Sequence, residues 1–144
     1  TGDKNSKIQF LIRATKDPLG ANLDRVQVVK GWLDSAGISH EKVFNVAWSG
    51  DRNLNNEKLS AVGDTVSRVD GSVKNTIGSI ELSTIWVDPS FNHEQRAFYY
   101  VRVLQIPTAR HSLYDAIALQ IDAPIEGPAV IQERAYTSAI WYTP

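Results

Sequence analysis

Apolar and polar residues alternate along most of this chain, with the period of two that is typical of a β-strand with one buried face. In the first such run, Ile8, Phe10 and Ile12 alternate with mostly polar residues. The segment Asp17 to Gly20, which reads Asp-Pro-Leu-Gly, then has the composition of a turn. The pattern therefore predicts a first strand that ends in a tight turn.

A second and a third alternating run predict a β-hairpin. The second run extends from Val26 to Trp32, and Lys30 falls on its apolar face. A turn at residues 35–37, Ser-Ala-Gly, leads to the third run, from His40 to Trp48. Two alternating runs joined by a short turn that contains glycine are typical of an antiparallel hairpin.

The middle of the chain is more polar. Residues 49–65 are rich in asparagine and poor in β-branched residues, which predicts a long loop. Strand character returns from Thr65 to Val73 and again from Ile80 to Val87. We expect the latter strand to end at Asp88-Pro89, because proline cannot donate a hydrogen bond to a β-ladder.

The run from Phe98 to Ile106 is apolar on both faces except for two polar residues, one of which is Arg102. This pattern is typical of a central strand that is covered on each side. A buried guanidinium needs a polar partner to offset its desolvation. We therefore expect Arg102 to extend to the rim or to pair with Asp88, Asp115 or Glu133, and the alternative is that it anchors a substrate.

The region after this strand contains the one predicted helix. Ser112 to Gln120 has apolar residues four positions apart, which favours a short helix over a strand. Ser112 is the expected N-cap, and Asp115 falls at the capping-box position. Proline and glycine within residues 124–128 then break the chain before a final extended segment, Ala129 to Tyr142.

Short strands with turn signals about every ten residues predict a mainly all-β fold. We expect an antiparallel, immunoglobulin-like β-sandwich with one short helix and a long Asn-rich loop. A chain of 144 residues fits one domain that is large enough to bury its own core. We assign residues 7–144 to this domain, as a C-terminal fragment of a larger protein, and interpret the polar residues 1–6 as a cut linker.

Charge and composition narrow the range of partners. The chain has 15 Lys and Arg residues against 16 Asp and Glu and no basic run, so we expect no binding of nucleic acid. No stretch approaches the roughly 18 consecutive apolar residues of a membrane span, so we expect no membrane insertion. Cysteine is absent, which excludes disulfides and thiolate chemistry within the chain.

The sequence contains no recognisable catalytic or metal-binding motif. Three histidines lack the spacing of a metal site: His40, His93 and His111. Residues 51–62 begin like a calcium loop, but Asn56 replaces the sixth-position Gly and Val62 replaces the twelfth-position Glu. No P-loop, dinucleotide-binding or nucleophile-elbow pattern occurs. We therefore expect no catalytic residue, no cofactor and no metal ligand in this chain.

Aromatic residues cluster from Phe98 to Tyr100 and at Trp141-Tyr142. They either fill a core or a domain contact, or form a platform on which sugar rings stack. A flat exposed row of Trp and Tyr would favour the sugar platform. An apolar patch around Tyr114 and residues 136–142 would favour a domain contact.

Five phrases of the sequence carry a resemblance to a known family: Asp24–Leu33, Trp86–Pro89, Arg96–Thr108, Tyr114–Ala116 and Ile131–Pro144. They are similar to the C-terminal region of the domain-of-unknown-function 3604 family. The resemblance implies a longer bacterial protein whose N-terminal part has His-rich motifs similar to those of PHP-type metallohydrolases. It also favours a periplasmic or extracellular location. The metal ligands of those motifs have no counterpart in this chain.

The resemblance implies that this chain is a non-catalytic accessory domain of a metal-dependent hydrolase and packs on the N-terminal catalytic domain of the same protein. The alternatives are an independent module that binds a carbohydrate or another ligand, and a small hydrolase. Loops gather where the central strand ends, and the last segment adds amphipathic aromatics, a composition that suits a domain contact. The expected contact face comprises Arg110, Tyr114, Asp115, Glu133, Arg134, Tyr136, Trp141 and Tyr142.

Overall fold

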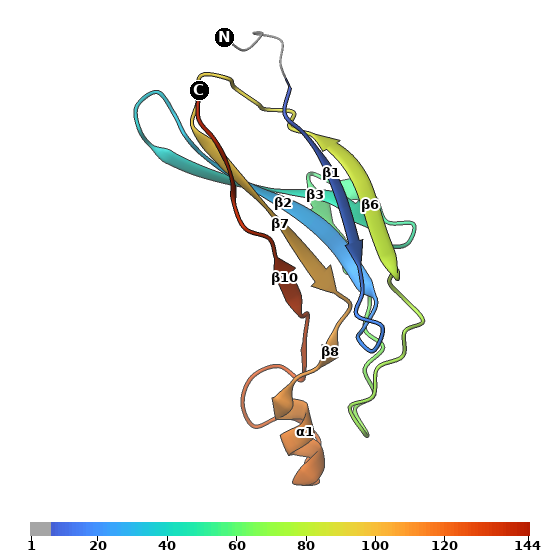
Figure 1. Ribbon diagram of the computed structural model, residues 1–144. Helices are drawn as coiled ribbons and strands as arrows, with labels where there is room; N and C mark the ends of the chain where they lie inside the picture. Colours follow the sequence, from blue (N-terminus) through green and yellow to red (C-terminus); the bar gives the residue numbers. More distant parts are fainter. Residues whose placement is uncertain (1–6) are drawn as a thin grey trace.

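Two antiparallel β-sheets of unequal size form the body of the structure, a computed structural model that describes residues 7–144 (Figure 1). The smaller sheet has two strands, β1 (Gln9–Thr15) and β6 (Glu81–Val87). β1 confirms the first predicted strand, and the backbone N–H of Gly20 closes the predicted turn on the Asp17 carbonyl at 2.9 Å.

The larger sheet has five strands and is built around β2 (Leu23–Leu33). Its neighbours are β3 (Ser39–Trp48), which confirms the predicted hairpin, and β7 (Ala97–Gln105). The other edge of β7 pairs with β10 (Arg134–Tyr136) and β11 (Ile140–Tyr142). β7 is thus a central strand, and the two sheets form the predicted antiparallel β-sandwich.

The core lies between the two sheets. β1 contributes Ile12, and Phe10 packs beside it. The predicted apolar face of β2 is turned inward, so Val26 and Val28 are buried there. Lys30 lies on the same inward face and is 2% exposed, so the charge that interrupted the apolar pattern is inside the sandwich.

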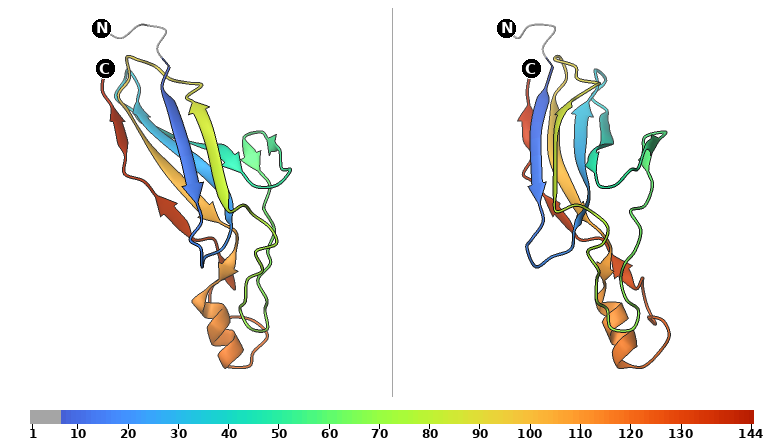
Figure 2. Two further views of the ribbon diagram at one scale, coloured as in Figure 1. Left: turned by 45° about the vertical axis from the view of Figure 1, so that its right-hand side comes forward. Right: turned by 90° about the vertical axis from the view of Figure 1, so that its right-hand side faces the viewer.

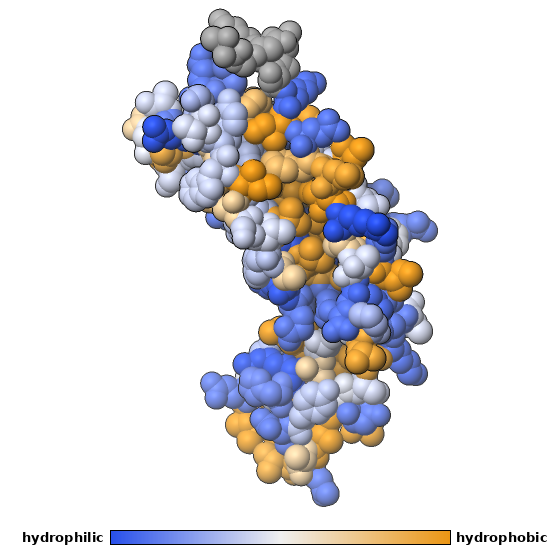
Figure 3. All heavy atoms as spheres, viewed as in Figure 1, coloured by the Kyte–Doolittle hydropathy of each residue, from blue (hydrophilic) through white to orange (hydrophobic). Residues whose placement is uncertain are grey.

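A smaller lobe extends from one end of the sandwich (Figures 2 and 3). It contains helix α1 (His111–Ala118), the short pair β8 (Thr108–Ala109) and β9 (Val130–Ile131), and the loop at residues 64–79. The ring of Tyr114 lies on Gly71, where a Cβ atom would be 2.4 Å from Tyr114 Cε1. This close approach holds the loop against the helix.

The predicted strand from Thr65 to Val73 is wrong. Only one isolated bridge, between Val66 and Val73, forms there. The chain turns at Gly71, whose φ is 73°, and the Asp70 carboxylate accepts hydrogen bonds from the backbone and hydroxyl of Ser72. Aspartate followed by glycine favours such a turn over an extended strand.

The predicted long loop at residues 49–65 contains a small hairpin. β4 (Leu54–Asn55) pairs with β5 (Lys58–Leu59). The turn between them has positive φ at Asn56 (48°) and Glu57 (65°), the geometry that two-residue hairpin turns require. Asparagine tolerates this conformation, so the Asn-rich composition marks a tight turn as well as a loop.

The helix is present, but its predicted cap is wrong. Arg110 occupies the N-cap position and no side chain caps the helix. The Ser112 hydroxyl instead donates a hydrogen bond to the Pro128 carbonyl at 2.7 Å, so it ties α1 to the following loop. Asp115 is exposed on the helix and makes no capping box.

Candidate functional site

The outward face of the larger sheet carries a row of aromatic side chains. Phe98 and Tyr100 lie two residues apart on β7, with parallel rings whose centroids are 6.4 Å apart. Trp141 of β11 lies directly opposite Phe98, and their centroids are 5.3 Å apart. Tyr136 of β10 adjoins Tyr100 at 6.1 Å. The row therefore spans three strands that the sequence brings together only through sheet pairing.

This row is partly open to solvent. The side chain of Trp141 is 75% exposed and that of Tyr136 is 56% exposed, whereas Phe98 and Tyr100 are half-buried. A groove of about 350 Å³ lies beside Trp141 and Phe98, with Gly31 and Arg96 also in its wall. Rings with one free face next to a groove are suited to contact a flat apolar surface of a ligand or of a protein.

Gly31 shapes the floor of this groove. A Cβ atom at this position would lie 2.3 Å from the Phe98 ring, so only glycine lets that ring lie flat on β2. The sequence pattern did not single out Gly31. The signal was a glycine inside an otherwise strongly β-forming strand, which often marks a close approach by another group.

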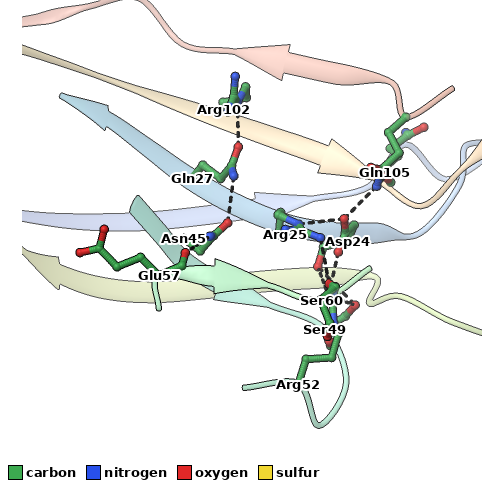
Figure 4. A network of polar contacts seen from close by, with 11 residues as sticks. Asp24, Arg25, Gln27, Asn45, Ser49, Arg52, Glu57, Ser60, Arg102 and Gln105 are labelled. Carbon is green, nitrogen blue, oxygen red and sulfur yellow. Dashed lines mark hydrogen bonds and ion pairs between the residues drawn. The ribbon is translucent and has the colours of Figure 1, made fainter. Parts of the chain in front are cut away.

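Next to the aromatic row, a chain of polar side chains crosses the same sheet face (Figure 4). Arg102 Nε donates to Gln27 Oε1 at 2.8 Å, and Gln27 Nε2 donates to Asn45 Oδ1 at 2.9 Å. Asn45 Nδ2 donates in turn to the backbone carbonyl of Glu57 at 3.3 Å. The chain links β7, β2 and β3 to the small β4–β5 hairpin.

The expected carboxylate partner of Arg102 is therefore wrong. Among the described residues, its guanidinium hydrogen-bonds an amide oxygen, that of Gln27, and makes no ion pair. Asp88 forms an ion pair with Lys30 on the inward side of the sheet. Arg102 faces outward and is half-buried, so the β-ladder register, which places Gln27 directly opposite it, decides its partner.

A buried carboxylate, Asp24, lies at the centre of a further polar cluster (Figure 4). Its Oδ1 accepts a hydrogen bond from Arg52 Nη2 at 2.7 Å. Its Oδ2 accepts hydrogen bonds from Arg25 Nε at 2.9 Å and from Gln132 Nε2 at 2.8 Å. Both guanidiniums are also largely buried, with side-chain exposures of 13% for Arg25 and 11% for Arg52. Asp24 thereby fastens the loop after β3 and the segment before β10 to the start of β2.

A second buried cluster connects the two sheets. Lys30 Nζ lies 2.6 Å from Asp88 Oδ2 and also donates to the Ser90 carbonyl at 2.9 Å. The Tyr99 hydroxyl donates to the same Asp88 oxygen at 2.8 Å. Lys30 Nζ lies 5.2 Å from the Trp32 ring centroid, a cation–π contact. Every charged group in this cluster has a partner, so it is suited to hold the sheets together.

The pKa values of this cluster follow from burial and hydrogen bonding. Burial raises the pKa of the Asp88 carboxyl, but the hydrogen bonds that it accepts together lower the pKa below its ordinary value. Among these hydrogen bonds, the one from Lys30 has the largest effect. Burial raises the pKa of the Tyr99 phenol, and the hydrogen bond to Asp88 raises it further. Asp88 is therefore held ionised and Tyr99 neutral at neutral pH.

These clusters have the features of structural networks. Every buried side-chain nitrogen and oxygen in the described part of the chain has a hydrogen-bond partner. Within residues 7–144, no group of three or more metal-ligating side chains comes together. His40 binds Asp34 at 2.8 Å on the surface, and His93 approaches Glu94 at 3.8 Å. The described clusters thus link separate segments of the fold through paired polar groups.

The eight residues of the expected contact face lie in four places. Arg110, Tyr114 and Asp115 are in the smaller lobe, whereas Tyr136 and Trp141 lie on the outward face of the larger sheet. Tyr142 is turned the other way: its ring packs on Phe91 with centroids 5.0 Å apart, and its hydroxyl donates to the His93 carbonyl. The remaining two residues, Glu133 and Arg134, are exposed at the start of β10.

Sequence reasoning missed the residues that hold the clusters together. Asp24 and Lys30 each interrupt an apolar strand, and this was the available signal, because a charge in a buried strand needs a buried partner. Their main partners, Arg52 and Asp88, come from loops distant in sequence. The pairing therefore depends on tertiary structure.

The fold and these sites define an antiparallel β-sandwich domain with internally paired charges and an aromatic outward face. The chain belongs to the DUF3604 family of proteins of unknown function, whose family model matches residues 1–144, the whole chain. Comparison with curated proteins finds no match, and comparison with solved structures finds none either. In the described part of the chain, no helix has the length and apolar character to cross a membrane.

Proposed function

We propose that this chain is a non-catalytic accessory domain that packs on a metal-dependent hydrolase domain of the same protein. The observation that supports this proposal is the exposed apolar surface of the C-terminal strands. On the outward face, Trp141 and Tyr136 are 75% and 56% exposed, respectively. Large apolar side chains gathered on one surface are typical of a protein contact.

The smaller lobe lies beyond these strands along the length of the molecule. β11, β10 and α1 follow one another along the length of the structure in each view (Figures 1 and 2). Tyr114 of α1 is 51% exposed, and Arg134 stands beside the aromatic row on β10. Tyrosine, tryptophan and arginine are the residues that protein interfaces favour, so this composition suits a domain contact.

The proposal is tested in the full-length protein by replacing both Trp141 and Tyr136 with alanine. We expect faster hydrogen exchange over residues 134–142 and readier proteolytic cleavage between the domains, because the contact loses its two largest side chains. Ile85→Ala is the matched control, since Ile85 is 62% exposed on the smaller sheet, away from the proposed contact. Equal effects of the double variant and the control would contradict the proposal.

A second candidate function is carbohydrate binding at the groove beside Gly31. Its support is the open ring of Trp141 next to a groove of about 350 Å³, with the exposed Arg96 at its wall. Calorimetry with neutral oligosaccharides and with oligogalacturonates tests this candidate. Binding that is lost in Trp141→Ala but retained in Ile85→Ala would favour a ligand-binding module over a domain contact.

A further inference from the structure

The first strand of the sandwich has one unpaired edge. In the described structure β1 pairs only with β6. Their ladder is bounded by hydrogen bonds from Lys16 N to the Ile80 carbonyl and from Asp88 N to the Ile8 carbonyl. In an antiparallel ladder every second residue of a strand exchanges such bonds with the neighbouring strand. The backbone N–H and C=O groups of the even-numbered residues of β1 therefore point toward β6. The backbone groups of the odd-numbered residues therefore point to the opposite edge: Gln9, Leu11, Arg13 and Thr15.

A groove lies at one end of this edge, beside Ala14 and Thr15. Ala135 pairs with Val103, and Ile140 pairs with Tyr99, so both side chains point to the inward face of the larger sheet. β10 and β11 lie to one side of β1, so the smaller sheet leaves this part of the inward face open (Figure 1). A groove of about 300 Å³ separates the end of β1 from Val103 and Ala135. Apolar side chains are visible on this side of the sandwich (Figure 3).

We propose that an extended strand from the catalytic domain of the same protein pairs with the free edge of β1 and reaches into the groove at the end of that edge. This inference rests on the proposed function, because the strand belongs to the domain that packs on the C-terminal strands. Trp141 lies on the proposed contact and its neighbour Ile140 lies on the groove side of the same strand. A docked domain at this contact is therefore adjacent to the groove.

The chemistry of the edge specifies the occupant. A row of alternating N–H and C=O groups with strand spacing is matched by another extended backbone, as in recognition by strand addition. The occupant needs apolar residues at alternate positions to cover Val103 and Ile140. The exposed Arg13 of β1 is already paired with Glu81 of β6 at 2.7 Å, so the backbone edge and the apolar positions, rather than charge, define the occupant.

The test is residue-resolved hydrogen exchange in the full-length protein. We expect the amides of Leu11 and Arg13 to exchange at least about a hundredfold more slowly than unpaired amides, because each donates to the added strand. The amides of Phe10 and Ile12, which face β6, are slow in either case and serve as the internal reference. Slow exchange at all four positions supports the inference.

A pair of substitutions at one position separates backbone pairing from side-chain packing. Leu11→Pro removes an N–H that points away from β6, so it leaves the β1–β6 ladder intact, while Leu11→Ala keeps that N–H. We expect Leu11→Pro, but not Leu11→Ala, to release the Arg13 amide to fast exchange. The reference amides of Phe10 and Ile12 report whether the variant is still folded.

Three outcomes contradict the inference, and they differ in whether they also contradict the proposed function. Fast exchange at Leu11 and Arg13 with protection over residues 134–142 means that the domains dock without an added strand, so the proposed function survives. Fast exchange at both places contradicts the proposed function as well. An Arg13 amide that remains slow in Leu11→Pro means that something other than strand pairing protects it.

Discussion

Asp24 holds three separate segments of the chain through three side-chain donors, and its carboxylate is fully buried. Removing it leaves two largely buried guanidiniums, those of Arg25 and Arg52, without their shared counter-charge. An uncompensated buried charge is much more costly than a lost surface ion pair, which contributes about 0 to 1 kcal/mol. The stability of this end of the sandwich is therefore sensitive to this one residue.

We predict that Asp24→Ala lowers the free energy of unfolding by about 3 to 5 kcal/mol, the usual cost of breaking a buried ion pair from one side. Urea denaturation followed by tryptophan fluorescence measures this change. Asp51→Ala is the control, because Asp51 is exposed on the neighbouring loop and should change stability by less than about 0.5 kcal/mol. A loss in Asp24→Ala as small as in the control would mean that the cluster is solvated in solution.

Asp88 gives the fold a dependence on acid pH. Its pKa in the folded chain lies below the ordinary value of 3.8. A group with a lowered folded pKa contributes stability that is full above its unfolded pKa and is lost as the pH falls through the folded pKa. We predict that the free energy of unfolding falls as the pH drops below about 4, and that Asp88→Asn makes this fall less steep.

Urea titrations of the wild type and of Asp88→Asn at a series of acidic pH values measure the two slopes. Two further residues, Asp34 and Asp70, also have lowered pKa values. The main cause is a hydrogen bond with His40 for Asp34 and with Ser67 for Asp70, so some acid dependence remains in the variant. Parallel curves for the two proteins would show that Asp88 is not the source of the difference.

At the scale of elements, Gly78 marks the point where the loop at residues 64–79 crosses the start of β2. Its φ is 80°, and a Cβ atom there would lie 2.7 Å from Ile106 Cγ2 and 3.0 Å from the Leu23 carbonyl oxygen. The Ser79 amide and the Leu23 carbonyl are hydrogen-bonded at 2.9 Å, so the backbone has little room to move. The junction therefore requires both the positive φ and the missing side chain of glycine.

We predict that Gly78→Ala destabilises the protein by more than Gly50→Ala. Gly50 has a similar φ of 70° but no atom within 4 Å of its built Cβ, so it reports the cost of the backbone conformation alone, about 1 to 2 kcal/mol. The difference between the two free energies of unfolding measures the steric cost at Gly78, which we expect to be at least about 1 kcal/mol. Equal losses would show that the junction relaxes around the new methyl group.

The predicted elements show which information the sequence holds at this scale. The strands at residues 9–15, 23–33 and 39–48 follow from alternation, which marks the inward face of each strand, although β2 is buried on both faces. The segment 65–73 also has β-branched residues, yet the chain turns there because Asp70 and Gly71 form a local turn. A β-propensity averaged over the whole segment does not reveal this turn. The final extended segment breaks into β9, β10 and β11, and these breaks depend on pairing with β8 and β7 rather than on local composition.

The candidate site was less predictable than the fold. The sequence indicated that Phe98 to Tyr100 and Trp141 gather aromatic surface, but sheet register decides that Tyr99 is buried while Phe98 and Trp141 meet on the outward face. The position of Tyr142 illustrates the same point. Adjacent residues of a strand face opposite sides, so it packs inward beside the exposed Trp141.

At the scale of the whole molecule, we predict that the isolated chain does not hydrolyse phosphate, sulfate or carboxyl esters, with or without added divalent metal ions. The physical reason is that no activated nucleophile or converging set of metal ligands is present among residues 7–144. Chromogenic esters of each class, tested with Mn²⁺ or Zn²⁺, measure this. Metal-dependent turnover that disappears when His40, His93 or His111 is replaced would contradict the prediction.

The pairing of β1 with β6 has a consequence for synthesis on the ribosome. Arg13 and its partner Glu81 are 68 residues apart in sequence, so the first strand emerges long before its neighbour exists. At roughly 5 to 20 residues per second, β1 waits for about 3 to 14 s. The β2–β3 hairpin, by contrast, can close as soon as it has been translated. The small sheet therefore assembles late, and β1 is the strand whose early exposure most needs protection by a chaperone.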